Sequence, residues 1–254
     1  MIDIHAHILP AVDDGSFSLE ESLRMLRMAE ASGVWAVAAT PHCNIPGSRS
    51  NYASEELMEQ LISLRQAVKA SGSDLVIYQG MEVYATRQMP RLLEEQKAWT
   101  LNGTQYFLTE FAFDEDPEFC RMILEDCFEA GFIPVIAHPE RYFFVQKNPQ
   151  IVYEWFCQGY GIQVNKGSLL GRFGRSTYDM AQLLMQHGLV TCVASDAHSS
   201  VQRTPHMHDV KQFLDKNYSE DYRSLVTEIN PRRILSGQPL YRLDPILFEG
   251  NGFR

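Results

Sequence analysis

The sequence has no long hydrophobic run, and no stretch approaches 18 consecutive apolar residues. A membrane-spanning helix is therefore not expected, nor is insertion into a membrane. No basic segment followed by an apolar one begins the chain, so we expect no signal peptide. The five cysteines are an odd number and never stand in CxxC spacing. These features predict a reduced chain located in the cytoplasm.

Positive charge is also scarce. The chain has 22 Lys and Arg against 32 Asp and Glu, which gives a net charge of −10. Such an acidic surface repels phosphate backbones, so nucleic acid is not an expected partner. The sequence contains no internal repeat, low-complexity tract or linker. We therefore expect one domain over residues 1–254, a length that can bury a full core.

Short apolar stretches alternate with helical patterns along the whole chain. The helical patterns include a capping box at Ser18 to Glu21 and leucines at positions 57, 61 and 64. We expect seven strands, at residues 1–7, 34–40, 75–78, 106–110, 133–138, 161–165 and 190–195. Seven such strand–helix units favour an α/β fold with parallel strands arranged as a barrel.

Histidines and carboxylates stand where these strands end. In the first strand, alternation predicts Ile2, Ile4 and Ala6 on one face and Asp3, His5 and His7 on the other. The later candidates are Asp14, His42, Glu82, Glu110, His138, Asp196 and His198. Barrel active sites lie at the carboxyl ends of the strands. So many carboxylates at one rim would repel one another unless cations lay between them.

Several of these residues fall in short motifs that resemble those of the PHP (polymerase and histidinol phosphatase) superfamily. The motifs are His5-x-His7, Thr40-Pro41-His42, Gly80-x-Glu82, His138-Pro139-Glu140-Arg141 and Ser195-Asp196-Ala197-His198. The runs from Asp3 to Gly15 and from Gln163 to Gly171 are similar to a narrower group. This group is the CpsB/YwqE type, the bacterial manganese-dependent protein-tyrosine phosphatases of capsule and exopolysaccharide operons. The resemblance covers nearly the whole chain.

The resemblance implies a distorted (β/α)7 TIM-like barrel of the PHP type that holds up to three metal ions. Mixed imidazole and carboxylate ligands suit Mn²⁺, with Fe or Zn²⁺ as alternatives. Carried onto matching positions, the first ion would take His5, His7, Glu82 and Asp196. The second would share Glu82 and add Glu110 and His138. The third would take Asp14, His42 and His198.

The same resemblance implies a phosphomonoesterase that acts on phosphotyrosine. The expected partner is the phosphotyrosine-rich C-terminal tail of a bacterial tyrosine kinase that controls polysaccharide export, and the oligomeric state is left open. A metal-bound hydroxide would be the nucleophile. Arg141 and Arg203, which lie beside the ligand motifs, are the candidates for catalysis and for bidentate binding of phosphoryl oxygens. No general acid is assigned, because a phenolate with a pKa near ~10 leaves readily.

Other functions compete with this interpretation. The run from His42 through Cys43 to Arg49 matches the H-C-x5-R signature of cysteine-based tyrosine phosphatases. Such a loop needs inward-pointing N–H groups and a thiolate. Pro46 removes one donor, and the signature uses His42, so we interpret the match as coincidence.

Three further alternatives concern the barrel itself. An amidohydrolase would want a lysine where Glu110 stands and a histidine where Asn165 stands. A histidinol-phosphate phosphatase or a nuclease would keep the metal ligands and change only the leaving group. A non-catalytic binding module is the last alternative, and the presence of all nine ligand residues argues against it.

Overall fold

Parallel strands form the centre of the computed structural model, which describes residues 1–48 and 50–248. The strands in these residues are β1 (Ile2–Ala6), β2 (Ala36–Ala39), β3 (His42–Cys43), β4 (Val76–Gln79), β5 (Glu82–Tyr84), β6 (Tyr106–Glu110), β7 (Ile133–Ala137), β8 (Gly161–Asn165) and β9 (Cys192–Ala194). They pair in two sheets, in the orders β1-β2-β4 and β3-β5-β6-β7-β8-β9. Every expected strand is present, and two of them resume after a break as the short strands β3 and β5, which were not expected.

The divided strands explain why there are two sheets. The strand expected at residues 34–40 ends at β2 and resumes as β3 beyond Thr40 and Pro41. Pro41 has no N–H group to donate to a neighbouring strand. The next strand is divided in the same way into β4 and β5, around Gly80 and Met81. A Cβ at Gly80 would lie 2.9 Å from Leu101 Cδ2, so the close approach of the chain there requires glycine.

The first strand lies beside the last one. The Asp196 N–H donates to the His5 carbonyl at 2.8 Å, and the His7 N–H donates to the Ala197 carbonyl at 2.8 Å. An isolated parallel bridge joins Ala6 to Ala197. With β2 continuing into β3 and β4 into β5, the strands follow one another in chain order around a ring. The predicted α/β, distorted TIM-like architecture is therefore confirmed.

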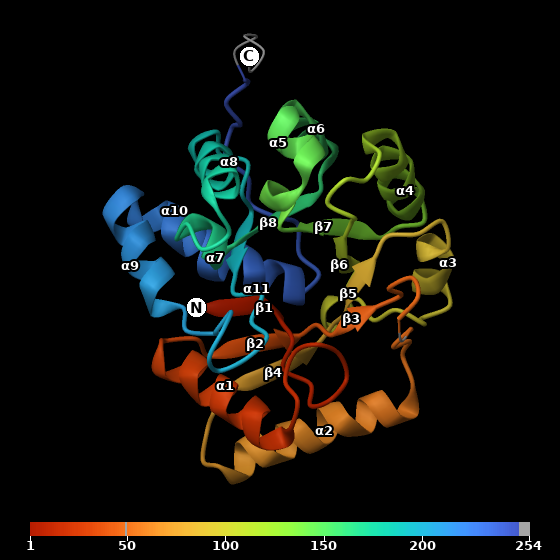
Figure 1. Cartoon of the computed structure of the whole chain (residues 1–254), viewed down its shortest axis with the longest axis vertical. Coiled ribbons are helices and arrows are strands. Elements are labelled where there is room, and N and C mark those ends of the chain that lie inside the picture. The colour runs from red at the N-terminus through yellow and green to blue at the C-terminus, as the bar shows by residue number, and fades with distance from the viewer. Residues whose placement is uncertain (49, 249–254) are drawn as a thin grey trace.

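Most of the helices surround the strands on the outside of this ring (Figure 1). The helices are α1 (Leu19–Ala31), α2 (Glu55–Ala70), α3 (Met89–Glu94), α4 (Pro117–Glu129), α5 (Phe143–Lys147), α6 (Gln150–Gln158), α7 (Lys166–Leu169), α8 (Arg175–Gln186), α9 (His208–Asn217), α10 (Glu220–Ser224) and α11 (Asn230–Leu235). Short turns of other helix types are η1 (Leu101–Gly103), η2 (Pro139–Arg141) and η3 (Leu225–Ile229). The expected cap is present, since Ser18 Oγ accepts from the Glu21 N–H at 3.2 Å. Among residues 1–48 and 50–248, no helix has the length and apolarity needed to cross a bilayer.

A bulge in β1 corrects the predicted alternation. Ile2 pairs with Ala36, but Ala6 pairs with Ala39, so the register shifts by one residue within the strand. Ile2 and Ile4 pack in a small apolar cluster with Ile234 and Leu235 of α11, whereas Ala6 belongs to the larger core. The prediction that these three residues share one face was wrong.

The side chain of Asp3 also differs in its partners from the imidazoles of His5 and His7. Its Oδ1 atom accepts from the Ser195 N–H at 3.0 Å, whereas His5 and His7 bring their Nε2 atoms to 3.3 Å from each other. The bulge therefore turns the histidine pair toward the carboxyl ends of the strands. The single-domain organisation stays a prediction, and residues 249–254 lie outside the described part.

Candidate metal centre

The nine predicted ligands lie together at the carboxyl ends of the strands. Their nitrogen and oxygen atoms form four overlapping groups, and within each group the atoms lie within 4.8 Å of one another. The groups are His7–Asp14–His42–His198, His5–His7–Asp196, His5–Glu82–His138 and His42–Glu82–Glu110. The ring of strands therefore brings together residues that are far apart in the sequence.

The first predicted ligand set consists of His5, His7, Glu82 and Asp196, whose side chains converge on one another. His5 Nε2 lies 3.2 Å from Glu82 Oε2, and His7 Nε2 lies 3.3 Å from the same oxygen. Asp196 Oδ1 is 3.5 Å from each of these nitrogens. All four residues are almost completely buried.

Hydrogen bonds on the far side of each ring orient the two histidines. Nδ1 of His5 lies 2.8 Å from Gln163 Oε1, and Nδ1 of His7 lies 2.7 Å from Asp13 Oδ2. These oxygens can only accept, so both Nδ1 atoms carry the hydrogen and both neutral rings present an Nε2 lone pair to the cluster. The Nε2 lone pairs of both rings then face one oxygen each of Glu82 and Asp196, with no N–H or O–H group of these four side chains to bond them. A divalent cation fits this donor set.

The pKa values of the buried histidines and of Glu82 are shifted by their close contacts with one another. Burial lowers the pKa of His7, but the Asp13 carboxylate and the other acids raise it well above its ordinary value. The pKa of His5 is also raised, because Glu82 and Asp196 outweigh burial. Burial raises the pKa of Glu82, but the surrounding histidines hold it well below the usual range. These shifts show how strongly the buried carboxylates attract positive charge, which a bound cation would also supply.

The second predicted set lies beside the first. His138 Nε2 is 2.9 Å from Glu82 Oε1 and 3.9 Å from Glu110 Oε2. His42 Nδ1 lies 3.0 Å from Glu110 Oε1 and 3.1 Å from Glu82 Oε2, yet it is not aligned for a hydrogen bond with either. The buried Asp196 Oδ1 likewise has no hydrogen-bond partner among the described residues. Buried polar atoms without partners are unusual and fit ligands of an ion.

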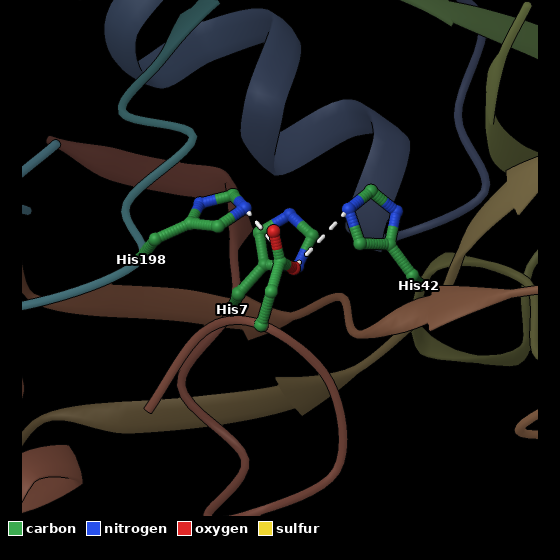
Figure 2. A group of neighbouring side chains, drawn as sticks. His7, His42 and His198 are labelled. Atoms are coloured by element: carbon green, nitrogen blue, oxygen red, sulfur yellow. Dashed lines mark ion pairs between the residues drawn. The ribbon is translucent and has the colours of Figure 1, made fainter. Parts of the chain in front are cut away.

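The third predicted set lies nearest to the surface. His7, His42 and His198 approach one another from three separate segments of the chain (Figure 2). Asp14 Oδ1 lies 3.5 Å from the Nε2 atoms of both His42 and His198. Burial and the charge of neighbouring His7 lower the pKa of His198 to about 2. His198 is therefore neutral near pH 7, as a metal ligand must be.

Three of the predicted site residues have a left-handed backbone. The φ angles of His138, Asp196 and Arg203 are 37°, 51° and 49°. Such angles are uncommon for residues other than glycine, and they cluster at functional sites. His138 and Asp196 turn the chain sharply just after β7 and β9, and Arg203 lies further along the loop that follows β9.

Both predicted arginines lie beside the cluster. Arg141 Nη1 is 3.5 Å from Asp196 Oδ2, and Arg203 pairs with the same oxygen. The Arg141 guanidinium lies between two aromatic rings, 4.7 Å from the centre of Phe113 and 4.9 Å from that of Phe173. Such cation–π contacts hold a guanidinium in place while its N–H groups stay free to bind an anion.

Sequence reasoning missed the residues that support the ligands. Asp13, Gln163 and Asn165 all contact predicted ligands through hydrogen bonds. All three stand in the quoted motifs, and the second nitrogen of each ligating histidine requires a partner of this kind. Phe113 and Phe173 carried no comparable signal.

Cys43 does not have the environment of a nucleophile. Its side chain is fully buried at the end of β3, and burial raises the pKa of the thiol to about 12. A thiol with this pKa stays protonated near pH 7 and is a poor nucleophile. Arg49, the last residue of the signature, lies outside the described residues. The geometry of Cys43 thus argues against a cysteine-based phosphatase.

Comparison with known proteins gives the family. A family described as "Capsular polysaccharide synthesis, CpsB/CapC" matches residues 1–236. The tyrosine-protein phosphatase YwqE of Bacillus subtilis is 33% identical over 245 residues, which span 96% of this chain and 95% of YwqE. A histidinol phosphate phosphatase structure from Lactococcus lactis shares only the fold, with a TM-score of 0.54 and 14% identity over 86% of this chain and 94% of its own.

A crystal structure from work on YwqE of Bacillus subtilis and CpsB of Streptococcus pneumoniae is much more similar. It has a TM-score of 0.91 and 32% identity, and the match covers 98% of this chain and 100% of that one. Those two proteins are described as metal-dependent tyrosine phosphatases. The sequence match and the shared fold give one result: this chain belongs to the CpsB/CapC family of capsular polysaccharide synthesis.

Proposed function

We propose that this protein is a metal-dependent protein-tyrosine phosphatase. The observation that carries the proposal is the convergence of nine histidines and carboxylates, with two arginines beside them, at one rim of the barrel. Relatives at about one-third identity over nearly their full length are named tyrosine-protein phosphatases, which supports the same activity here.

The cluster would hold up to three divalent ions, with Mn²⁺ as the first choice and Fe or Zn²⁺ as alternatives. We assign His5, His7, Glu82 and Asp196 to the first ion. Glu82, Glu110 and His138 would hold the second. Asp14, His42 and His198 would hold the third. When bound, such ions would activate a water molecule and neutralise the charge that develops on the phosphoryl group.

The protein's own residues would bind and orient the phosphoryl group. Arg141 and Arg203 carry N–H donors beyond those that face Asp196, and these would grip phosphoryl oxygens. The two rings around Arg141 fix its position before substrate binds, which lowers the cost of ordering it. The phenolate of tyrosine leaves without strong help from an acid.

The proposed substrate is a phosphotyrosine protein, namely the tail of a tyrosine kinase that controls capsular or exopolysaccharide synthesis. The capsular family description supports this role. We propose a cytoplasmic location, where the tail of such a kinase would be reached.

A comparison of substrates tests the proposal. Metal-free protein would be reloaded with Mn²⁺ and assayed on a phosphotyrosine peptide, a phosphoserine peptide and histidinol phosphate. We expect turnover of the phosphotyrosine peptide, lost with chelator and restored by Mn²⁺. The Arg141→Lys variant should weaken turnover, whereas the matched control Arg175→Lys, at an exposed helix position, should not.

Two results would contradict it. Rapid hydrolysis of histidinol phosphate without action on phosphotyrosine would keep the metal chemistry and reject the substrate. No turnover of any phosphoester by Mn²⁺-loaded protein would favour a binding module.

A further inference from the structure

β8 contributes no ligand to the proposed metal sites, yet it places two amides against them. Gln163 and Asn165 stand two positions apart in this strand, so their side chains lie on the same side. Both side chains are completely buried. A fully buried amide has four hydrogen-bonding positions to satisfy, so its partners define its role.

These amides form a continuous chain of hydrogen bonds between two proposed ligands. His5 Nδ1 lies 2.8 Å from Gln163 Oε1. Gln163 Nε2 donates to Asn165 Oδ1 at 2.8 Å, and Asn165 Nδ2 donates to Asp196 Oδ2 at 2.6 Å. The chain thus runs from a histidine of β1, through β8, to an aspartate just after β9.

The direction of every donor in this chain is fixed from one end. The Asp196 carboxylate accepts only, so Asn165 must present its NH₂ group there and its oxygen to Gln163. Gln163 must then donate to that oxygen and present its own oxygen to His5. His5 is consequently protonated at Nδ1, and its Nε2 lone pair faces the cluster.

The other end of this chain of hydrogen bonds orients the Asp196 carboxylate in a similar way. Asp196 Oδ2 is occupied by Asn165 and by the two arginines. Among the residues that the structure describes, Oδ1 has no hydrogen-bond partner, and it lies 3.5 Å from the Nε2 atoms of His5 and His7. This chain of hydrogen bonds through Gln163 and Asn165, here called the relay, therefore determines which atom His5 and Asp196 each offer to a metal ion.

We propose that Gln163 and Asn165 are positioning residues that fix the tautomer of His5 and the orientation of Asp196 for metal binding. The inference rests on the metal sites of the proposed function and not on the identity of the substrate. Loss of such supporting hydrogen bonds lowers metal affinity about 10- to 100-fold in metalloproteins. Because the two amides act in one chain, breaking either link should have much of the effect of breaking both.

The test measures Mn²⁺ binding to metal-free protein by calorimetry. We expect Mn²⁺ binding to weaken about 10- to 100-fold in each of Gln163→Met, Asn165→Leu and the double variant. The affinity of the double variant should be close to that of the single variant that binds Mn²⁺ more weakly. Gln163→Glu keeps the acceptor for His5 but has no donor for Asn165, so it should keep the His5 tautomer and still bind Mn²⁺ more weakly. Gln105→Met is the matched control, because that amide donates to the Gly237 carbonyl at 3.0 Å, at the start of β6. It should bind Mn²⁺ as wild type does.

A second measurement reports on the tautomer directly and does not depend on activity. ¹⁵N NMR of metal-free wild type, at a pH where His5 is neutral, should show His5 protonated at Nδ1. In Gln163→Met this preference should be lost.

Specific outcomes would overturn the relay. One is His5 protonated at Nε2 in the neutral wild-type ring, and another is unchanged Mn²⁺ affinity in folded Gln163→Met and Asn165→Leu. If Gln163→Met does not fold, unchanged Mn²⁺ affinity in folded Asn165→Leu would overturn it equally. Wild-type protein that binds no Mn²⁺ would instead refute the proposed function, so the two failures are distinguishable.

Discussion

The two ends of the strand ring hold opposite kinds of side chain. At the end where the strands begin, Ile2, Tyr106 and Cys192 pack in an apolar cluster that includes Ile234 of α11. At the end where they finish, histidines and carboxylates converge on one another. In β1 the change occurs between consecutive residues, from Ile4 to His5. The apolar end therefore stabilises the fold, and the polar end carries the residues of the proposed active site.

Removing a ligand from the polar end should have the largest effect. We expect His5→Ala to lower the turnover of a phosphotyrosine peptide by more than about 100-fold, because the loss of a direct ligand exceeds that of a supporting bond. Its free energy of unfolding without metal should fall at acidic pH, because the protonated ring that pairs with Glu82 and Asp196 is lost, and fall less at alkaline pH, where that ring is neutral. Peptide hydrolysis with excess Mn²⁺ and urea unfolding measure the two quantities. Activity near that of wild type would remove His5 from the site.

Truncation at the apolar end should reverse this pattern. Ile4→Ala should lower the free energy of unfolding by about 2–5 kcal/mol, because it leaves a cavity in a fully buried cluster. The turnover of the folded variant should stay close to wild type. Leu243→Ala, at an exposed side chain, is the control and should change neither quantity. A large loss of turnover without a loss of stability would show that the two ends are not separate.

The pH dependence should distinguish metal-free from metal-loaded protein. His5, His7 and His42 have raised pKa values, because nearby carboxylates outweigh burial. Their stabilisation is complete below the unfolded pKa of about 6.5 and is lost as the pH rises through the folded pKa. His198, with its pKa lowered to about 2, acts in the opposite sense, but only below about pH 6.5, where the unfolded chain takes up its proton.

Metal-free protein should therefore lose stability above about pH 6.5, by about 1.4 kcal/mol per pH unit for each net proton released. Mn²⁺-loaded protein should gain stability relative to it over the same range, because binding requires deprotonated ligands. Thermal unfolding of both forms between about pH 6 and about pH 9 measures the difference. Parallel curves for the two forms would contradict the assignment of these histidines as ligands.

A smaller effect is expected from the rings around Arg141. Phe173→Leu removes one cation–π contact, worth about 1 kcal/mol, so KM for the peptide should rise about fivefold with little change in kcat. Gly167→Ala should act similarly, because a Cβ there would lie 2.6 Å from the Phe173 ring. Phe128→Leu, whose ring packs on Tyr160, serves as the control. An unchanged KM in Phe173→Leu would exclude the positioning of Arg141 by this ring.

The smallest effect on activity is expected for Cys43→Ser. The buried thiol takes no part in the proposed chemistry, so turnover by the folded variant should equal that of wild type. The assay on phosphotyrosine peptide with Mn²⁺ is sufficient. Complete loss of turnover in a folded variant would restore the cysteine mechanism.

The polar end of the ring could be predicted residue by residue. A metal ligand must be one of a few residue types, and the parallel strands place their ends at one rim. His42, Glu110 and His138 could each be located from strand patterns alone. The assignment of particular ligands to particular ions stays a prediction.

The apolar end and the supporting residues were harder to predict. The alternating letters from Ile2 to His7 look the same with or without a bulge, because the extra residue is determined by the backbone of the neighbouring strand. Gln163 and Asn165 carried no signal by themselves. An amide gains its role from its partners, and these come from strands that only the fold brings together.

The junction between the first and last strands has a consequence for folding kinetics. The bridge between Ala6 and Ala197 joins segments separated by most of the chain, and contacts of such long range are the slowest to form. His5 and His7 lie on one side of that junction, with Asp196 and His198 on the other. An ion bound by residues on both sides would link the first and last strands. This link would form late in folding and would have to break early in unfolding. Chelation should therefore speed unfolding far more than it slows folding.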